Sequence, residues 1–344
     1  MALSKPPQTQ ISIRHTLTHS IQTESPNTIP PDMQRKTIVI AGETASGKSA
    51  LALWLAQHSP GGGEIVVADS MQVWRGMDIG TAKPTAAERA LVAHHGIDLA
   101  DPHHEAFSAA DWLREATRAI ADIQARQRSA IVVGGTNLYL RLLFEGLVES
   151  ARPDAEFRKS LDALDANALR EKLIQVDPET ASRLHINDRR RSVRALEIAH
   201  ATGQPASAAR NQWNSATTII PDRFQLILLD WSTAALNQRI NSRVQHFVDA
   251  GWLDEVNQLT RAAPLVAQAM EAVGYRELLD ALESRCSLKE AVEKIKIRTR
   301  RYAKQQRTWL RRFQTSPHCA TLDAENKIFE KISQEALSVL CGAI

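Results

Sequence analysis

The sequence predicts an α/β protein whose parallel β-sheet carries helices on both faces. Short apolar runs of strand length alternate with longer helix-forming segments, which is the pattern of a parallel sheet built from βαβ units. The first apolar run is followed by the loop pattern G-x-x-x-x-G-K-[ST] at residues 42–49 and then by a helix-forming segment. A charged, helical stretch without a convincing strand interrupts the alternation at residues 150–215. The sequence therefore predicts a P-loop NTPase-like sheet with a helical insertion subdomain.

The individual elements follow from local patterns. Apolar runs predict strands at residues 36–41, 65–68, 130–133 and 224–230. Helices are predicted up to about residue 58 after the first strand, at about 107–128, and through most of the chain from the last strand to about 313. Glycines at 61–63 break the chain before the second strand, and Gly134-Gly135-Thr136 forms a sharp turn after the third.

These elements divide the chain into domains. Residues 35–149 and 216–315 are expected to form the P-loop core domain, and residues 150–215 the helical insertion. Residues 1–34 are rich in Ser, Thr, Gln and Pro with almost no apolar periodicity, and we expect a disordered tail there. The pattern assigns no role to residues 316–344.

Composition excludes several classes of protein. The chain has 344 residues, of which 24% are charged and 43% hydrophobic, with a net charge of +3. Any affinity for nucleic acid must then come from local clusters of charge. Three widely spaced cysteines argue against a disulfide framework and against a Cys-x-x-Cys zinc site. No apolar run reaches the ~18 residues of a membrane span, so we expect no membrane partner. With the cysteine pattern, this predicts a cytoplasmic protein, for which a monomer is the default expectation.

The loop at residues 42–49 is predicted to bind a polyphosphate. Its glycines let backbone N–H groups curl around phosphate oxygens, and the following helix adds the positive end of its dipole. Lys48 is expected to reach terminal phosphate oxygens, and the Ser49 hydroxyl to bind Mg²⁺. The assigned loop residues are Gly42, Glu43, Thr44, Ala45, Ser46, Gly47, Lys48 and Ser49. The pattern does not say what happens to the phosphate.

Asp69, at the end of the second strand, is predicted to project into the same cleft. Three roles are open for it: a Mg²⁺ ligand, a general base on an acceptor, or an ordinary strand-end cap. The third strand ends in Gly134-Gly135-Thr136 instead of the acidic residue found in many P-loop ATPases, which disfavours a hydrolase. The irregular stretch 69–84 is expected to line the acceptor site.

Over residues 36–313 the chain resembles the tRNA dimethylallyltransferases of the shorter, bacterial type. The matching segments are GETASGKS (42–49), DSMQVWRGMDIGTAKP (69–84), HHGIDLADP (94–102), VGGTNLYLRLLFEGL (133–147), NDRRRSVRALEI (187–198), AMEAVGYREL (269–278) and TRRYAKQQRTWLR (299–311). The family transfers a dimethylallyl group from its diphosphate to N6 of the adenosine on the 3′ side of the anticodon. The loop then binds a diphosphate leaving group.

The resemblance implies roles for single residues. Asp69 would be the base that takes the N6 proton, and Thr44 would orient the diphosphate. An arginine on the helix with Arg239 and Arg243 would clamp the diphosphate; we favour Arg243, although the helical register leaves Arg239 open. Glu43 replaces the Pro usual in the family and brings negative charge near the diphosphate.

Two basic clusters are predicted to bind tRNA. Residues 294–312 hold nine Lys or Arg and no acid, and uncompensated like charges favour a polyanion partner. Ile295, Tyr302 and Trp309 recur every seven residues in this segment, and we expect its aromatic residues to join the core. The second cluster is 189–194 in the insertion. The implied tRNA-binding residues are Asp69, Ser70, Met71, Gln72, Thr136, Arg158, Arg190, Arg191, Ser192, Val193, Arg194, Gly274, Tyr275, Arg276, Arg300, Arg301 and Lys304.

Other functions remain open at this stage. A P-loop small-molecule kinase or a prenyltransferase acting on free adenine nucleotides would share the core, but neither needs two arginine-rich helices. An RNA-stimulated ATPase would explain those helices but not the Gly-Gly-Thr strand end.

Overall fold

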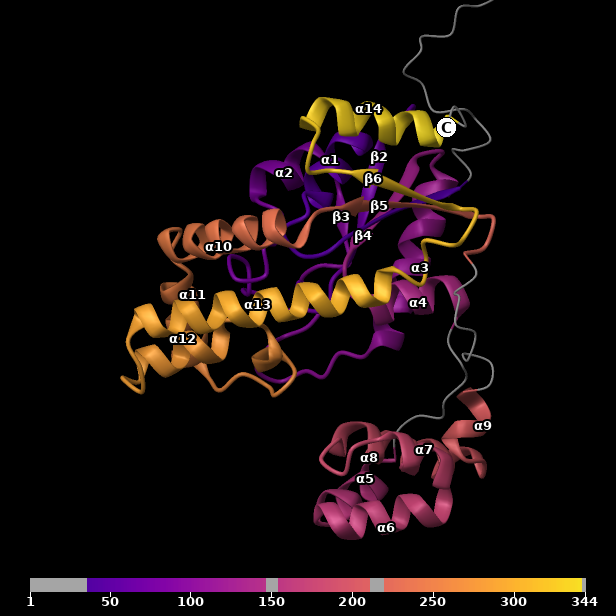
Figure 1. The fold of residues 1–344 in the computed structure, drawn as a ribbon, viewed down its shortest axis with the longest axis vertical. Coiled ribbons are helices and arrows are strands. Elements are labelled where there is room, and N and C mark those ends of the chain that lie inside the picture. Colours follow the sequence, from indigo (N-terminus) through magenta and orange to yellow (C-terminus); the bar gives the residue numbers. More distant parts are fainter. Residues whose placement is uncertain (1–35, 147–153, 211–219, 342–344) are drawn as a thin grey trace, which may run out of the picture.

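A computed structural model describes residues 36–146, 154–210 and 220–341. Its centre is a six-stranded parallel sheet with the order β3-β2-β4-β1-β5-β6 (Figure 1). The strands are β1 (Thr37–Ala41), β2 (Gly63–Ala68), β3 (His94–His95), β4 (Ser129–Gly134), β5 (Phe224–Asp230) and β6 (Cys319–Asp323). β1, β2 and β4 are buried along their whole length, as their continuous apolar runs require in a sheet covered on both faces. The predicted fold class is confirmed.

Helices cover the two faces of the sheet. Those of the core domain are α1 (Lys48–His58), α2 (Ala86–Leu91), α3 (Ala109–Ala125), α4 (Asn137–Glu145), α10 (Thr233–Asp249), α11 (Trp252–Ala262), α12 (Tyr275–Leu282), α13 (Leu288–Leu310) and α14 (Phe329–Leu340). Leu55 of α1 and Leu337 of α14 pack with Ile38 of β1 on one face. Trp112 of α3 and Leu140 of α4 pack on the other face. The helices α10 to α13 share a third core with the loop that follows β2.

The insertion forms a separate helical body (Figure 1). It consists of α5 (Ala155–Asp162), α6 (Ala166–Val176), α7 (Pro178–Arg183), α8 (Arg189–Thr202) and α9 (Ala206–Arg210). Leu161, Leu173 and Leu196 are central to a core of its own. The predicted insertion boundaries, like the predicted disordered tail at 1–34, lie outside the described residues.

The C-terminal segment, to which the sequence assigned no role, belongs to the sheet. β6 pairs in parallel with β5, with Leu322 beside Leu229, and α14 covers the same face as α1. β6 has only one strongly buried residue among five, because it lies at an edge. Its sequence therefore lacks the apolar run that marks the central strands.

The prediction that the aromatic residues of the basic segment join the core is partly wrong. Ile295 is fully buried, but Tyr302 keeps 37% of its surface exposed and Trp309 is only partly buried. α13 packs against α10 and α12 and also against α4. Because the neighbours of α13 change along its length, different faces of the helix are buried at different positions. A single seven-residue spacing therefore does not describe the buried residues of α13.

Candidate active site

Three strand ends meet at one edge of the sheet. The loop at 42–49 follows β1, Asp69 follows β2, and Gly135-Thr136 follows β4, and these strands are neighbours in the order β2-β4-β1. The Thr136 hydroxyl accepts a hydrogen bond from the Ser70 N–H at 3.0 Å. Thr136 therefore holds the end of β2 to the turn after β4.

The loop after β1 has the backbone conformation of a phosphate cradle. Ala45 and Gly47 have positive φ angles of 67° and 94°, which turn successive N–H groups toward one side. The Lys48 ammonium donates to the Glu43 carbonyl at 3.2 Å, so its side chain curls back over the loop. Burial, together with the neighbouring Arg243 charge, lowers the pKa of Lys48 to about 8. A buried ammonium beside a second cation favours an arriving anion.

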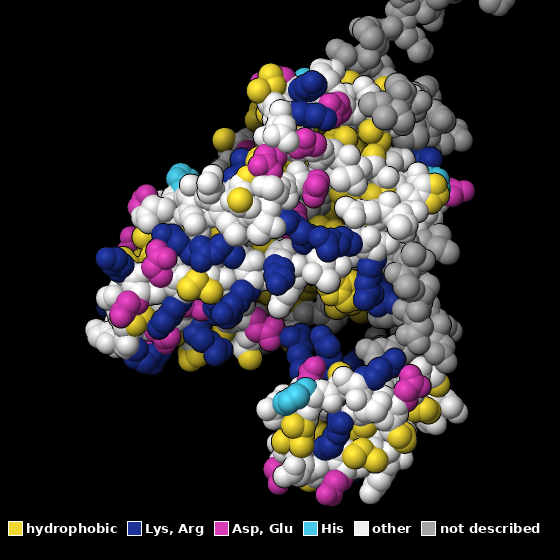
Figure 2. All heavy atoms as spheres, in the orientation of Figure 1, with side chains coloured by type: hydrophobic (Ala, Val, Ile, Leu, Met, Phe, Trp, Pro, Cys, Tyr) yellow, Lys and Arg dark blue, Asp and Glu magenta, His cyan; other side chains and the backbone are white. Residues whose placement is uncertain are grey.

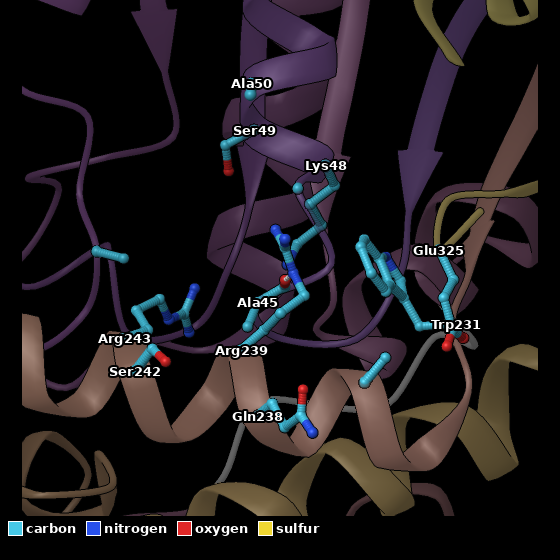
Figure 3. A pocket seen from close by; sticks show the side chains of 13 residues that line it. Ala45, Lys48, Ser49, Ala50, Trp231, Gln238, Arg239, Ser242, Arg243 and Glu325 are labelled. Atoms are coloured by element: carbon cyan, nitrogen blue, oxygen red, sulfur yellow. Dashed lines mark hydrogen bonds between the residues drawn. The ribbon is translucent and has the colours of Figure 1, made fainter. Parts of the chain in front are cut away.

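Two arginines from α10 complete this cationic site. The Arg243 guanidinium donates to the Thr44 hydroxyl, and Arg239 Nε donates to the Ala45 carbonyl at 2.8 Å. Figure 3 shows both side chains reaching from α10 toward the loop, where they line a cavity of about 780 Å³ with Lys48 and Ser49. Burial lowers the pKa of Arg243 to about 10. Both arginines reach the loop, and Arg243 is the one that contacts Thr44.

The residues present fit Mg²⁺ bound through a substrate. The Ser49 side chain lines the cavity (Figure 3) and offers one oxygen ligand. Among the described residues, no three Asp, Glu, His or Cys side chains come together as a metal site. Mg²⁺ binds one or two protein ligands and completes its octahedron with water and phosphate oxygens, so Ser49 would hold it together with a bound diphosphate.

Asp69 lies among these charged groups. Its Oδ1 accepts the Met71 N–H at 2.9 Å, which is the strand-end cap considered for it. Its charge raises the pKa of both Lys48 and Arg243, against the larger effect of burial. For Oδ2 the structure shows no hydrogen bond within the described parts of the chain. One carboxylate oxygen thus fixes the turn while the other can accept a proton.

The irregular loop after β2 is held from α11. The Glu255 carboxylate accepts the N–H groups of Asp78 at 2.8 Å, Ile79 at 2.6 Å and Gly80 at 3.2 Å. The Tyr275 hydroxyl donates to the same carboxylate at 2.6 Å. Satisfying four donors fixes Glu255 and, with it, the loop that borders Asp69.

Several residues predicted to contact tRNA have buried side chains in this structure. The side chain of Tyr275 is fully buried, and those of Ser192 and Val193 are almost so. Gln72 is also buried and donates to the Thr81 carbonyl at 3.0 Å, and a side chain on Gly274 would collide with the Trp252 ring. The matched segments run through elements whose buried faces serve packing, so these side chains support the fold.

The arginines predicted in the insertion have acidic partners. Arg158 and Arg194 both pair with Glu197 at 3.2 Å. Arg190 pairs with Glu271, in the 3₁₀ turn η3 (Ala269–Glu271) of the core domain, at 3.1 Å. Arg191 is exposed. These partners reduce the net charge that the cluster offers to a polyanion.

The basic segment on α13 is also partly compensated, contrary to the prediction. Lys296 pairs with Glu293 on the same helix, Arg298 with Glu277 of α12 and Arg307 with Glu43 of the loop after β1. Arg300 donates to the neutral Asn241 of α10. Arg276, Arg301 and Lys304 are exposed, and the structure shows no acidic partner for them among the described residues. Figure 2 shows Lys and Arg gathered over α10 to α13 and on the side of the insertion that faces them.

Glu43 does not add free negative charge to the loop after β1. It is 2% exposed, and its carboxylate accepts a hydrogen bond from Arg307 Nε. The ion pair joins the loop to α13, 264 residues further along the chain.

The model of the IPP transferase family matches residues 72–313. The chain belongs to this family. The resemblance found in the sequence is thereby confirmed, and residues 42–49, which lie outside the matched range, add the phosphate loop.

Relatives and solved structures agree with this membership. IPP transferase relatives include tRNA dimethylallyltransferase 1 of Citrifermentans bemidjiense, 48% identical over 275 residues, which cover 80% of this chain and 88% of that protein. The tRNA dimethylallyltransferase of Myxococcus xanthus is 46% identical over 280 residues, which cover 80% and 89%. The tRNA isopentenylpyrophosphate transferase of Bacillus halodurans aligns with a TM-score of 0.65 and 36% identity, over 90% of this chain and 96% of that one. A eukaryotic dimethylallyltransferase studied while acting on tRNA aligns with a TM-score of 0.72 and 30% identity, over 85% and 74%.

In this IPP transferase, one residue that was not predicted links the parts of the site. Gln306 of α13 accepts the Thr44 N–H at 2.9 Å and donates to the Gly135 carbonyl at 2.8 Å. A signal existed in the sequence, because Ala303, Gln306 and Leu310 have the spacing of one helix face. A polar residue on a buried apolar face requires a polar partner.

Among residues 36–146, 154–210 and 220–341, no helix combines the length and apolar character that crossing a membrane requires.

Proposed function

We propose that the chain transfers a dimethylallyl group from dimethylallyl diphosphate to N6 of the adenosine adjoining the anticodon of tRNA on its 3′ side. The proposal is supported by the names of the relatives and by one observation above all: a cationic phosphate site lies beside Asp69, and no acidic residue ends β4. That arrangement suits a diphosphate leaving group better than phosphoryl transfer to water.

The donor side of the reaction requires stabilisation of negative charge. As the allylic C–O bond breaks, its electron pair goes to the diphosphate oxygens. Lys48, Arg239 and Arg243, together with the loop N–H groups, are fixed before the substrate arrives, and charges fixed in this way are effective because they need little rearrangement. Mg²⁺, held by Ser49, would supply further positive charge to the diphosphate.

The acceptor side requires removal of a proton. Adenine N6 is a weak nucleophile because its lone pair is delocalised into the ring. As the new C–N bond forms, N6 gives up one proton to Asp69 Oδ2, while Oδ1 stays on the Met71 N–H. Such positioned proton transfer contributes a factor of roughly 10²–10⁴.

The adenosine has to leave its stack to reach this cleft, at a cost of a few kcal/mol. The exposed cations Arg276, Arg301 and Lys304, with Arg191 on the insertion, offer phosphate contacts that offset this cost. We expect the protein to act as a monomer in the cytoplasm.

A transfer assay tests the proposal. The enzyme with Mg²⁺ receives radiolabelled dimethylallyl diphosphate and tRNA lacking the modification, beside parallel reactions with free AMP and with labelled ATP. Label on tRNA alone is the expected result. Label on AMP would assign the chain to prenyltransferases of free nucleotides, and ATP turnover without prenyl transfer would contradict the role given to Asp69.

A further inference from the structure

Gln306 is a buried amide that uses both of its ends on backbone groups. Its side chain lies on α13 and is 3% exposed. Its Oε1 accepts the Thr44 N–H at 2.9 Å, and its Nε2 donates to the Gly135 carbonyl at 2.8 Å. These bonds connect segments 171 and 262 residues away in sequence. An interior amide with both ends satisfied is well ordered, and removing either partner is costly.

The two backbone groups belong to opposite halves of the reaction. Thr44 carries the hydroxyl that Arg243 contacts, on the donor side. Gly135 precedes Thr136, which holds Ser70, the neighbour of Asp69, on the acceptor side. Transfer requires the reacting carbon and nitrogen to approach to about 3–3.5 Å. A group that joins the two loops therefore influences this approach without touching either substrate.

The contact between Gln306 and Gly135 leaves no free space. A Cβ on Gly135 would lie 2.4 Å from Gln306 Nε2 and 2.9 Å from the Gly42 carbonyl oxygen. The phosphate loop, the turn after β4 and α13 are thus in direct contact at this point. A small displacement of α13 must move at least one of the two loops.

The next residue of α13 makes a second link to the phosphate loop. Arg307 pairs with Glu43 and also donates to the Thr233 hydroxyl at 2.6 Å and to the Trp231 carbonyl at 2.9 Å. Less than two turns earlier, the exposed Arg301 and Lys304 belong to the surface expected to bind tRNA. The same helix therefore contacts the donor loop on one side and offers cations to tRNA on the other.

We propose that Gln306 is a positioning residue that sets the spacing between the phosphate loop and the Gly135-Thr136 turn and couples this spacing to tRNA bound on α13. The inference rests on the proposed function for the identity of the two substrates. Gln306 itself takes no part in bond making, and its effect is on how well the donor and the acceptor are aligned.

The kinetic test compares Gln306→Leu with Gln305→Leu. Gln305 is the neighbouring glutamine and is exposed, so its replacement is a matched control. We expect Gln306→Leu to lower kcat roughly 10- to 100-fold per folded enzyme, with the Kd for tRNA within about threefold of the parent. Gln305→Leu should leave kcat unchanged. Unchanged kcat in folded Gln306→Leu would overturn the proposal.

The coupling is measured by binding, without turnover. In the parent enzyme, an anticodon stem-loop RNA should increase the affinity for inorganic diphosphate severalfold, and diphosphate should increase the affinity for the RNA by the same factor. In Gln306→Glu, the carboxylate can still accept the Thr44 N–H but cannot donate to Gly135, and the factor should fall toward one. Gln306→Glu also tests the proposal if Gln306→Leu does not fold. Equal coupling in the parent and the variant would overturn the proposal.

These outcomes are separate from those of the proposed function. If the parent enzyme transfers no prenyl group to tRNA, the proposed function fails. The effect of Gln306 on diphosphate binding can still be measured in that case.

Discussion

At the scale of single residues, the two carboxylate oxygens of Asp69 have separate roles in the proposed reaction. Because an asparagine amide oxygen can still accept the Met71 N–H, Asp69→Asn keeps the cap and removes only the base. We expect kcat to fall by roughly 10²–10⁴, with tRNA affinity within a few-fold of the parent. Single-turnover prenyl transfer and filter binding check this. A variant that retains full activity would exclude Asp69 as the base.

The lowered pKa of Lys48 predicts that the reaction depends on pH. Its pKa of about 8 in the free enzyme means that the ammonium is present below pH 8 and disappears as the pH rises through this value. We therefore expect kcat/KM for dimethylallyl diphosphate to fall about tenfold per pH unit above pH 8, while kcat at saturation falls at higher pH, because bound diphosphate favours the charged lysine. Lys48→Arg keeps its charge and should have a flat profile in this range. The same decline in the arginine variant would assign the titration to another group.

Local sequence patterns placed the strands that position the candidate site residues, but they did not reveal contacts between residues far apart in the sequence. The loop at residues 42–49 and Asp69 each follow a strand whose apolar run can be read in the sequence. The burial of Glu43 could not be predicted, since its partner Arg307 lies on a helix that the local pattern does not place. Which loop group each of Arg239 and Arg243 contacts could be read only from the actual position of α10.

At the scale of elements, α13 is the helix on which a surface role can be tested. We expect the double variant Arg301→Glu, Lys304→Glu to weaken tRNA binding and to lower the slope of log Kd against log salt by about 1–2, because each phosphate that the protein ceases to neutralise lowers the slope by roughly 0.7–0.9. Affinity for inorganic diphosphate should not change. The salt dependence of tRNA binding measures the effect.

The control for this experiment lies on α14. Lys331 is exposed at the first turn of that helix, so Lys331→Glu introduces the same kind of charge change away from α13. If it weakened tRNA binding as much per charge as the α13 variant does, the effect would be one of net charge and not of a specific surface.

Element boundaries were predictable where burial is uniform. β1, β4 and β5 differ from the expected ranges by at most one residue at either end, because strands covered on both faces read as unbroken apolar runs. β3 has two residues and β6 lies at an edge, so neither has such a run. Their pairing with longer strands, which is a tertiary effect, makes them strands.

At the scale of the whole molecule, the insertion has its own core and lies in the chain between α4 and β5, whose adjoining residues are in contact. Phe144, just before it, and Phe224, just after it, have ring centroids 5.3 Å apart. A short Gly/Ser linker replacing residues 147–219 should therefore leave a folded core that binds diphosphate normally. We expect tRNA affinity to fall at least tenfold and prenyl transfer to be abolished. Diphosphate titration and circular dichroism check that the core is intact.

The outcome that would contradict this prediction is full tRNA binding by the shortened chain. That result would assign tRNA recognition to α13 and its neighbours alone. The parallel sheet with helices on both faces was predictable because alternating strands and helices allow few arrangements. The position of the insertion relative to the core was not, since it depends on contacts such as Arg190 with Glu271 that no local pattern encodes.

The links from α13 to the phosphate loop have a consequence for synthesis on the ribosome. Chains emerge from the N-terminus and fold domain by domain, so the phosphate loop is made early. Arg239, Arg243, Gln306 and Arg307, which contact it, are made much later, and β6 after all of them. A nascent chain thus has the loop but not the groups that hold it until nearly the whole chain has been translated. Premature termination before residue 306 should give a product that cannot assemble the diphosphate site.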